Sequence, residues 1–149
     1  MMTSHSVAHG TFVLERSYLA SPARVFKAWA DPVAKATWFG DGTPPQEFDF
    51  RVGGRELVSA GEGENAFAFD VRYEDIVENN RIIYTYYMII GGKRISVSVA
   101  AVELFAEGEG TRLTVTEHGC FLDGLDTMDQ RKRGTSDLLD ALGAALARV

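Results

Sequence analysis

The last third of the sequence places a strand directly before a long amphipathic helix, and this pair constrains the fold more than any other stretch. Residues 111–118 alternate apolar and polar side chains, which is typical of a strand with one buried face. Thr127-Met128-Asp129-Gln130 matches a capping box and predicts a helix that has Thr127 as its N-cap. The helical pattern runs to about residue 147, and we expect this helix to cover a sheet.

One stripe of this helix changes character along its length. At 100° per residue the stripe contains Met128, Arg131, Thr135, Leu138, Leu139, Leu142 and Leu146. Its second half is apolar and predicts a sealed core. Its first half carries Arg131 and Thr135, with Gly134 beside them, where a sealed core would have leucine. We therefore predict that this half of the helix covers a space.

The rest of the chain supplies the sheet. Ser21-Pro22 and Asp31-Pro32 each predict a helix start, so two short helices follow a first strand. Further strands are separated only by Gly or Asn turns, which predicts an antiparallel meander and an α+β fold. The expected strands are 11–19, 47–52, 55–60, 66–78, 81–90, 93–106 and 111–118. We expect residues 1–10 to form a flexible tail and residues 11–149 a single domain.

Composition excludes several classes of function. The formal net charge of −6 argues against general binding to nucleic acids or anionic membranes. No apolar run approaches the ~20 residues that span a bilayer, and the N-terminus has no signal-peptide pattern. The single cysteine, Cys120, fits a reducing compartment. We expect a cytoplasmic protein.

Four motifs, in order, resemble a known family. They are residues 28–40 (Ala-Trp-Ala-Asp-Pro to Thr-Trp-Phe-Gly), 49–55 (Asp-Phe-Arg-Val-Gly-Gly-Arg), 73–85 (Tyr-Glu-Asp-Ile-Val-Glu to Arg-Ile-Ile-Tyr-Thr) and 113–135 (Leu-Thr-Val-Thr-Glu-His-Gly to Gly-Thr). Together they resemble the activator-of-Hsp-90-ATPase-homologue (C-terminal-domain-like) branch of the START-related SRPBCC superfamily. The resemblance implies a helix-grip fold, in which a curved seven-stranded antiparallel sheet grips the C-terminal helix around a cavity. It also implies binding of small hydrophobic molecules, or cyclase-like activity in a minority of members.

Glu117 and Arg131 form the most informative pair of candidate residues. Glu117 shares a strand face with Leu113 and Val115, so it should point toward the helix. Arg131 lies on the inward stripe nearby, and we hypothesise that the two pair at the mouth of the cavity. The alternative is that both side chains reach solvent.

His118 and Cys120 are two residues apart and could form a thiol–imidazole dyad. No third group is evident to orient the histidine, so we expect Cys120 to be a structural residue at the end of the strand. The three histidines and one cysteine match no metal-site spacing. We therefore assign no catalytic residue, no metal and no cofactor.

The expected ligand-binding set combines aromatic side chains with the polar residues of the last third. It comprises Trp38, Phe48, Phe50, Phe69, Tyr73, Tyr84, Tyr86, Glu117, Phe121, Met128, Arg131 and Thr135. Binding of a small hydrophobic or amphipathic molecule is the leading hypothesis. A cyclase- or hydrolase-like enzyme using Glu117 and a co-chaperone-like interaction module are the alternatives, and a homodimer is a possible assembly.

Overall fold

The computed structural model of the protein describes residues 5–40, 42 and 44–148. In chain order its elements are β1 (Val7–Tyr18), α1 (Pro22–Ala30), α2 (Pro32–Ala36), β2 (Glu47–Phe48), β3 (Arg55–Ala60), η1 (Gly63–Asn65), β4 (Phe67–Val77), β5 (Arg81–Ile90), β6 (Lys93–Glu107), β7 (Gly110–Leu122) and α3 (Met128–Ala147).

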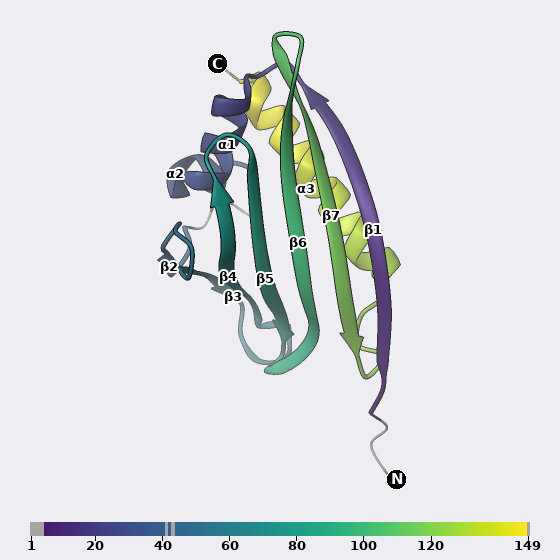
Figure 1. Cartoon of the computed structure of the whole chain (residues 1–149). Helices are drawn as coiled ribbons and strands as arrows, with labels where there is room; N and C mark the ends of the chain where they lie inside the picture. Colours follow the sequence, from purple (N-terminus) through teal and green to yellow (C-terminus); the bar gives the residue numbers. More distant parts are fainter. Residues whose placement is uncertain (1–4, 41, 43, 149) are drawn as a thin grey trace.

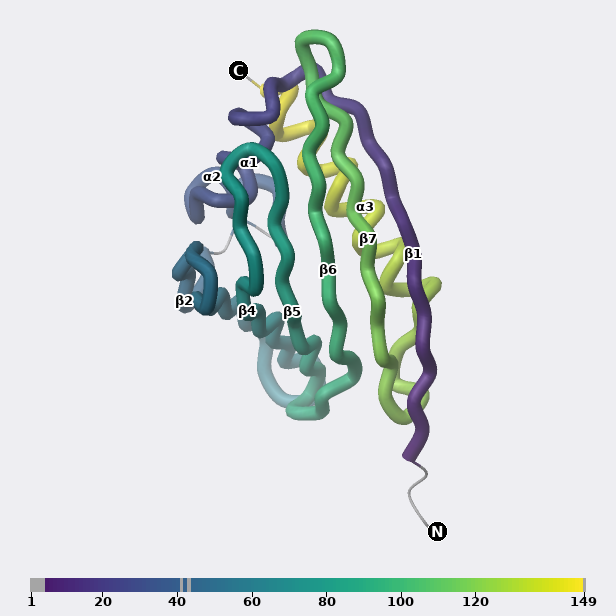
Figure 2. The backbone as a smooth tube through the Cα atoms, viewed as in Figure 1, coloured from purple at the N-terminus to yellow at the C-terminus, as the bar shows by residue number. Residues whose placement is uncertain are grey.

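The described strands form one sheet that curves around α3. The seven strands are ordered β1-β7-β6-β5-β4-β3-β2, and every neighbouring pair is antiparallel. Helix α3 lies across one face of the sheet, and α1 and α2 cover the end of that face near the C-terminus of α3 (Figure 1). The predicted α+β helix-grip fold is confirmed. The tube in Figure 2 shows that the start of β1 and the connection from β7 to α3 lie at the same end of the molecule.

The three helices begin where the sequence predicts. Ser21 and Asp31 cap α1 and α2 through hydrogen bonds to Arg24 N and Val33 N, and each helix has proline in its first turn. Thr127 accepts a hydrogen bond from Gln130 N at 3.2 Å, which caps α3. The sequence predicts a second short helix that runs to about Trp38-Phe39, but α2 ends at Ala36.

Strands β1 and β7 are both longer than expected. Strand β7 runs through Gly119 to Leu122, although the sequence predicts a break at Gly119, and β1 begins at Val7 rather than Thr11. The reason is mutual pairing: residues 7–10 pair with residues 119–122, and β6 pairs with β7 on its other side. Residues 7–10 therefore belong to the sheet, not to the expected tail, whereas residues 1–4 lie outside the described part.

The first hairpin differs from its expected form. Strand β2 contains only Glu47 and Phe48, and residues 49–54 form a wide turn instead of a two-residue turn at Gly53-Gly54. The backbones of Gly53 and Gly54 pair with Tyr73 of β4 instead of continuing the β2 ladder. Gly53 has a φ of +84°, which a side chain would disfavour.

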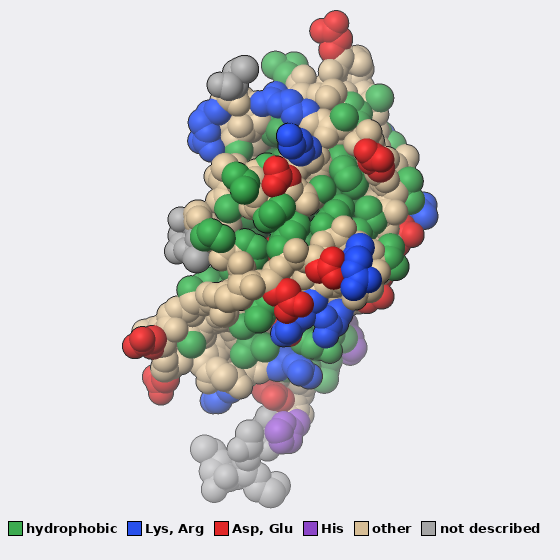
Figure 3. Space-filling view, turned by 90° about the vertical axis from the view of Figure 1, so that its left-hand side faces the viewer, with side chains coloured by type: hydrophobic (Ala, Val, Ile, Leu, Met, Phe, Trp, Pro, Cys, Tyr) green, Lys and Arg blue, Asp and Glu red, His purple; other side chains and the backbone are tan. Residues whose placement is uncertain are grey.

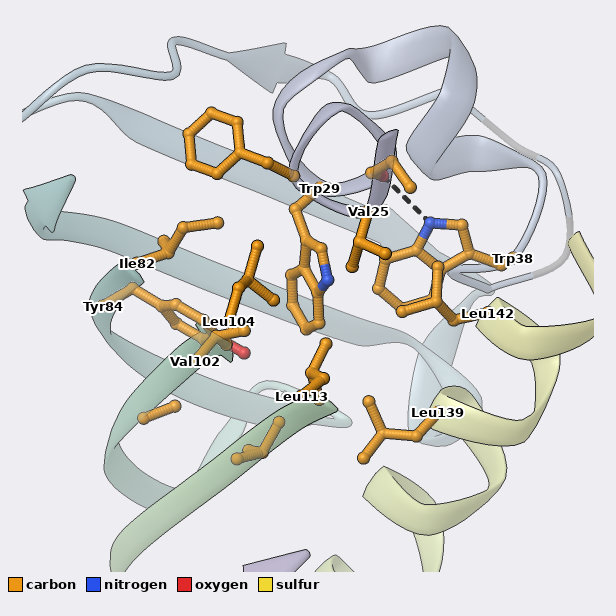
Figure 4. Close-up of a cluster of buried hydrophobic side chains, with 14 of the residues drawn as sticks. Val25, Trp29, Trp38, Ile82, Tyr84, Val102, Leu104, Leu113, Leu139 and Leu142 are labelled. Carbon is orange, nitrogen blue, oxygen red and sulfur yellow. Dashed lines mark hydrogen bonds between the residues drawn. The ribbon is translucent and has the colours of Figure 1, made fainter. Parts of the chain in front are cut away.

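The sealed part of the core lies where α1 meets the C-terminal half of α3. Trp29 lies at its centre, among Val25, Leu104, Leu113 and Leu139 (Figure 4). In the same cluster are Leu142 and Leu146 of α3, which are buried as the helical stripe predicts. This half of the interior is filled by side chains, so any space must lie toward the N-terminal half of α3.

Candidate functional site

A cavity of about 340 Å³ lies between the sheet and α3, bordered by the residues of the helix's N-terminal half. Its wall includes Gln130, Arg131, Gly134 and Thr135 of α3, so this half of the helix borders the cavity. On the side of the molecule that lies to the left in Figure 1, hydrophobic side chains gather across the middle, flanked by charged groups (Figure 3).

The structure brings part of the predicted set together at the cavity. The lining residues that the sequence predicts are Trp38, Phe69, Tyr84, Tyr86, Glu117, Arg131 and Thr135. All but Thr135 are buried, and Tyr87 of β5 faces outward, as alternation along the strand requires.

Two carboxylates line the cavity, those of Glu117 and Asp126, and Glu117 is only 4% exposed. The Tyr86 hydroxyl donates a hydrogen bond to Glu117 Oε1 at 2.5 Å, and the Thr135 hydroxyl donates to Oε2 at 3.1 Å. Because a carboxylate offers about four acceptor positions, Glu117 keeps capacity for a further donor.

The expected pairing of Glu117 with Arg131 is indirect. Arg131 Nη1 donates to the Tyr86 hydroxyl at 2.9 Å, so Tyr86 stands between the two charges. Arg131 forms its own ion pair with Asp126, at 2.8 Å. Both Glu117 and Arg131 are buried, so the alternative in which they reach solvent is wrong.

Arg131 is held by acceptors on several elements. Its Nη2 donates to Ser96 Oγ and Asp126 Oδ2, each at 2.8 Å, and its Nη1 lies 3.5 Å from Ser98 Oγ. The guanidinium also lies over the Phe121 ring, with 5.6 Å to the centroid. These contacts commit the two terminal nitrogens of Arg131 to the protein itself.

Burial dominates the electrostatics of this cluster. Desolvation raises the pKa of Glu117, while the hydrogen bond from Tyr86, the charge of Arg131 and the hydrogen bond from Thr135 oppose the rise. Burial likewise raises the pKa of Tyr86 and of Tyr84, and the charge of Glu117 adds to both shifts. Both phenols are therefore neutral at ordinary pH, and Tyr86 can act as a donor to Glu117.

A continuous set of rings, which we call the aromatic wall, borders the same cavity. It consists of Trp29, Trp38, Phe39, Phe69 and Tyr86. Successive ring centroids along it are 4.8, 5.6, 5.1 and 4.7 Å apart. Such contacts hold the rings in fixed relative positions, so the wall presents a preformed apolar surface.

The two indole groups of the wall differ in their hydrogen bonding. The Trp38 N–H donates to Ala28 O at 3.0 Å (Figure 4). The Trp29 N–H is buried and has no hydrogen-bond partner within the described residues.

Five residues of the predicted set lie outside the cavity lining: Phe48, Phe50, Tyr73, Phe121 and Met128. The Phe50 ring packs edge-on against the Tyr73 ring at 4.9 Å and against Phe26 of α1 at 5.7 Å, away from α3. Phe121 is covered by Arg131, and the space beside Gly10 is occupied by Met128. Tyr73 is buried, as the family resemblance implies, but the sequence does not indicate which helix it packs beneath.

Sequence reasoning missed a second buried polar cluster. Lys35 Nζ forms an ion pair with Glu56 Oε1 at 2.7 Å, and the Tyr73 hydroxyl donates to the same oxygen at 2.6 Å. Lys35 is 6% exposed and Glu56 is 1% exposed. The burial of Glu56 could have been predicted from the sequence. Alternation along β3 places Glu56 on the same face as Val58, which lines the cavity.

The thiol–imidazole dyad is not formed. His118 Nδ1 lies 2.9 Å from the Thr11 hydroxyl, and Cys120 Sγ lies 3.8 Å from Nδ1 of a different histidine, His9. Among the described residues, no group of three His, Cys, Asp or Glu side chains is placed to hold a metal ion. None of the helices described is long and apolar enough to cross a membrane.

Comparisons with known proteins agree with this architecture. The family described as Activator of Hsp90 ATPase homolog 1-like protein matches residues 19–147. Protein Mll3558 from Rhizobium loti is 45% identical, with a TM-score of 0.87 over 94% of this chain and 99% of that chain. A protein from Rhizobium leguminosarum is 41% identical, with a TM-score of 0.90 over 99% of this chain and 100% of that chain.

A more distant structure shares the fold alone. DynU16, a protein in the dynemicin biosynthetic locus, is 20% identical, with a TM-score of 0.71 over 93% of this chain and 47% of that chain. Among curated proteins, none matches this sequence. The family match extends over most of the chain, and the chain therefore belongs to the Activator of Hsp90 ATPase homolog 1-like family.

Proposed function

We propose that the protein binds a small hydrophobic or amphipathic molecule in the cavity between the sheet and α3. The observation that carries this proposal is the cavity itself, whose volume of about 340 Å³ falls in the range of small-molecule sites. The aromatic wall supplies apolar contact, and Glu117 supplies a polar group that can fix orientation. A cytoplasmic location and a possible homodimer remain predictions.

Binding of the neutral dye Nile red tests this proposal. Gly134 lines the cavity, and a Cβ added there would meet no heavy atom within 4 Å, so Gly134→Phe should place a ring in the cavity. Lys132→Phe is the matched control, because it adds the same ring at an exposed position of the same helix. We expect wild type and Lys132→Phe to enhance dye fluorescence saturably, and Gly134→Phe to lose most of that signal. Equal binding by all three proteins would contradict the proposal.

A second candidate, a cyclase- or hydrolase-like enzyme, is favoured by one observation. Burial raises the pKa of Glu117, which brings a carboxylate closer to the range useful for general acid–base catalysis. A neutral 4-nitrophenyl ester offers a direct test of hydrolysis. Catalysis by Glu117 requires that wild type accelerates release of nitrophenol and that Glu117→Gln does not, while both bind Nile red. No acceleration by wild type would count against a hydrolase.

The family description also keeps a co-chaperone-like role as the third candidate. Phe67 and Ile90, which line the cavity, are 37% and 38% exposed, and such apolar groups can contact another protein. The same exposure serves ligand entry, so it does not favour the third candidate over the first.

A further inference from the structure

Two buried glutamates on the concave face of the sheet have similar surroundings. Glu56 accepts a hydrogen bond from Tyr73, and Glu117 accepts one from Tyr86, at 2.6 and 2.5 Å. Glu56 is 1% exposed and Glu117 is 4% exposed. A buried carboxylate is costly unless its charge is compensated, so the groups opposite each glutamate are informative.

For Glu56 the compensating group is an ammonium that also lies against aromatic rings. Lys35 Nζ is 2.7 Å from the carboxylate, 4.7 Å from the centroid of Phe39 and 5.7 Å from that of Trp29. The carboxylate and the ring faces together offset the loss of water around the ammonium. This chain thus provides its own example of an aromatic cation site.

For Glu117 the corresponding cation is missing within the described residues. The nearest guanidinium, that of Arg131, is paired with Asp126 and reaches Glu117 only through Tyr86. Two carboxylates and one guanidinium leave this cluster with one negative charge. Burial raises the pKa of Glu117, and the hydrogen bond from Tyr86 and the charge of Arg131 offset that rise only in part.

We propose that the cavity takes an amphipathic organic amine, whose ammonium group pairs with Glu117 while its apolar body lies against the aromatic wall. Phe39 and Trp29 line this cavity and also face the Lys35 ammonium, so the same rings serve both sites. The net charge of −6 also favours the approach of a cation. An anionic ligand finds little to bind, because the terminal nitrogens of Arg131 are already committed. This inference rests on the proposed function and names its ligand class.

Three naphthalene ligands with the same ring system test the inference by calorimetric titration. They are 2-naphthylmethylamine, 2-naphthylmethanol and 2-naphthoate, which carry a cation, a hydroxyl and an anion. We expect the amine to bind wild type about tenfold more tightly than the alcohol, as a charge-assisted hydrogen bond would provide, and the naphthoate to bind most weakly. Glu117→Gln should abolish the advantage of the amine. The control Glu103→Gln, at an exposed position of β6, should keep it.

The outcomes separate this inference from the function on which it rests. If the alcohol or the naphthoate binds wild type as tightly as the amine, the amine class is wrong while cavity binding stands. An amine preference that survives in Glu117→Gln would also overturn the inference, since the cation would then pair elsewhere. If none of the three ligands binds and Nile red does not bind either, the proposed function fails as well. The comparison among ligands uses wild type, so it holds even if Glu117→Gln folds poorly.

Discussion

At the scale of single residues, Glu117 decides the character of the cavity. Leu113 and Val115 precede it on the same face of β7, and both are fully packed. Glu117 follows two residues after Val115, so alternation places its carboxylate on the same face, at the edge of the cavity. Two neutral hydroxyls, from Tyr86 and Thr135, hold it there. This arrangement fixes the position of the carboxylate without neutralising its charge.

Glu117→Gln should change how stability depends on pH. Burial raises the pKa of Glu117 above its ordinary value of 4.5, so the folded protein holds this proton more tightly than the unfolded chain does. The contribution of Glu117 to the free energy of unfolding is therefore greatest below pH 4.5. It declines as the pH rises toward the raised pKa and is level above it. The glutamine variant lacks this contribution.

Urea unfolding of wild type and Glu117→Gln at a series of pH values measures the effect. The free energy of unfolding of wild type minus that of the variant should decrease with rising pH in the stated window. Glu103→Gln, on the exposed side of β6, is the control variant. A difference that grows with pH would show that Glu117 is stabilised as a carboxylate instead.

At the scale of elements, α2 is attached to the sheet through one buried ion pair. Lys35 is the buried residue of this short helix, and its ammonium reaches Glu56 on β3. Since α2 leads into Trp38 and Phe39, this attachment also positions two rings of the aromatic wall. A five-residue helix has little stability of its own, so the ion pair and the capping by Asp31 matter more than helix propensity.

Lys35→Met should be strongly destabilising. It leaves Glu56 buried with the Tyr73 hydroxyl as its remaining partner, and breaking a buried pair in this way costs about 3–5 kcal/mol. Arg51→Met breaks the exposed pair with Asp49, which should cost less than about 1 kcal/mol. Urea unfolding gives both values. Similar losses in the two variants would mean that the Lys35–Glu56 pair is not what anchors α2.

The two glycines inside α3 should respond differently to alanine. Glycine costs a helix interior roughly 1 kcal/mol relative to alanine. At Gly134 a new methyl group meets open space, so Gly134→Ala should stabilise by about that amount. At Gly143 the methyl carbon would lie 3.1 Å from the Tyr18 ring, which is held by a hydrogen bond to Leu139 O. Gly143→Ala should therefore gain less or lose stability. Thermal unfolding checks the order, and a larger gain at Gly143 would contradict it.

The sequence predicts local features of these elements well and non-local features less well. The helix starts depend on caps at Ser21, Asp31 and Thr127, so the residues beside each cap are sufficient to locate them. The continuation of β7 past Gly119 depends on pairing with residues more than a hundred positions away, which no local pattern contains.

The same distinction explains the candidate site. Period two predicts the inward face of Glu117 correctly. It also puts Tyr84 and Tyr86 on one shared face, but it does not say whether that face points inward or outward. It does not indicate that Tyr73 is linked through Glu56 to Lys35 of α2, whereas Tyr86 contacts Arg131 of α3, because that depends on how the helices cross the sheet. Lys35 was missed for another reason: a lysine in a short helix is usually exposed, and only its partner on β3 makes burial possible.

At the scale of the whole molecule, the fold divides its interior into two parts. The C-terminal half of α3 and α1 close one part with leucine, valine and tryptophan side chains. The N-terminal half of α3 covers the other part and leaves it open. Because the cavity is bordered by α3, by the residues around α1 and α2, and by strands β3, β4, β5 and β7, a ligand there contacts most elements of the fold.

Ligand binding should consequently stabilise the entire fold as one unit. At a free concentration about 100 times its Kd, a ligand adds roughly 2.7 kcal/mol, which corresponds to a rise in Tm of roughly 5–10 °C for a protein of this size. Differential scanning calorimetry with the tightest of the three naphthalene ligands should show a single transition that moves upward with ligand concentration. In Gly134→Phe the Tm should not change with ligand concentration, because the introduced ring occupies the cavity. If the ligand instead split the wild-type transition into two, the cavity would stabilise only the elements beside it, and the two parts of the interior would unfold independently.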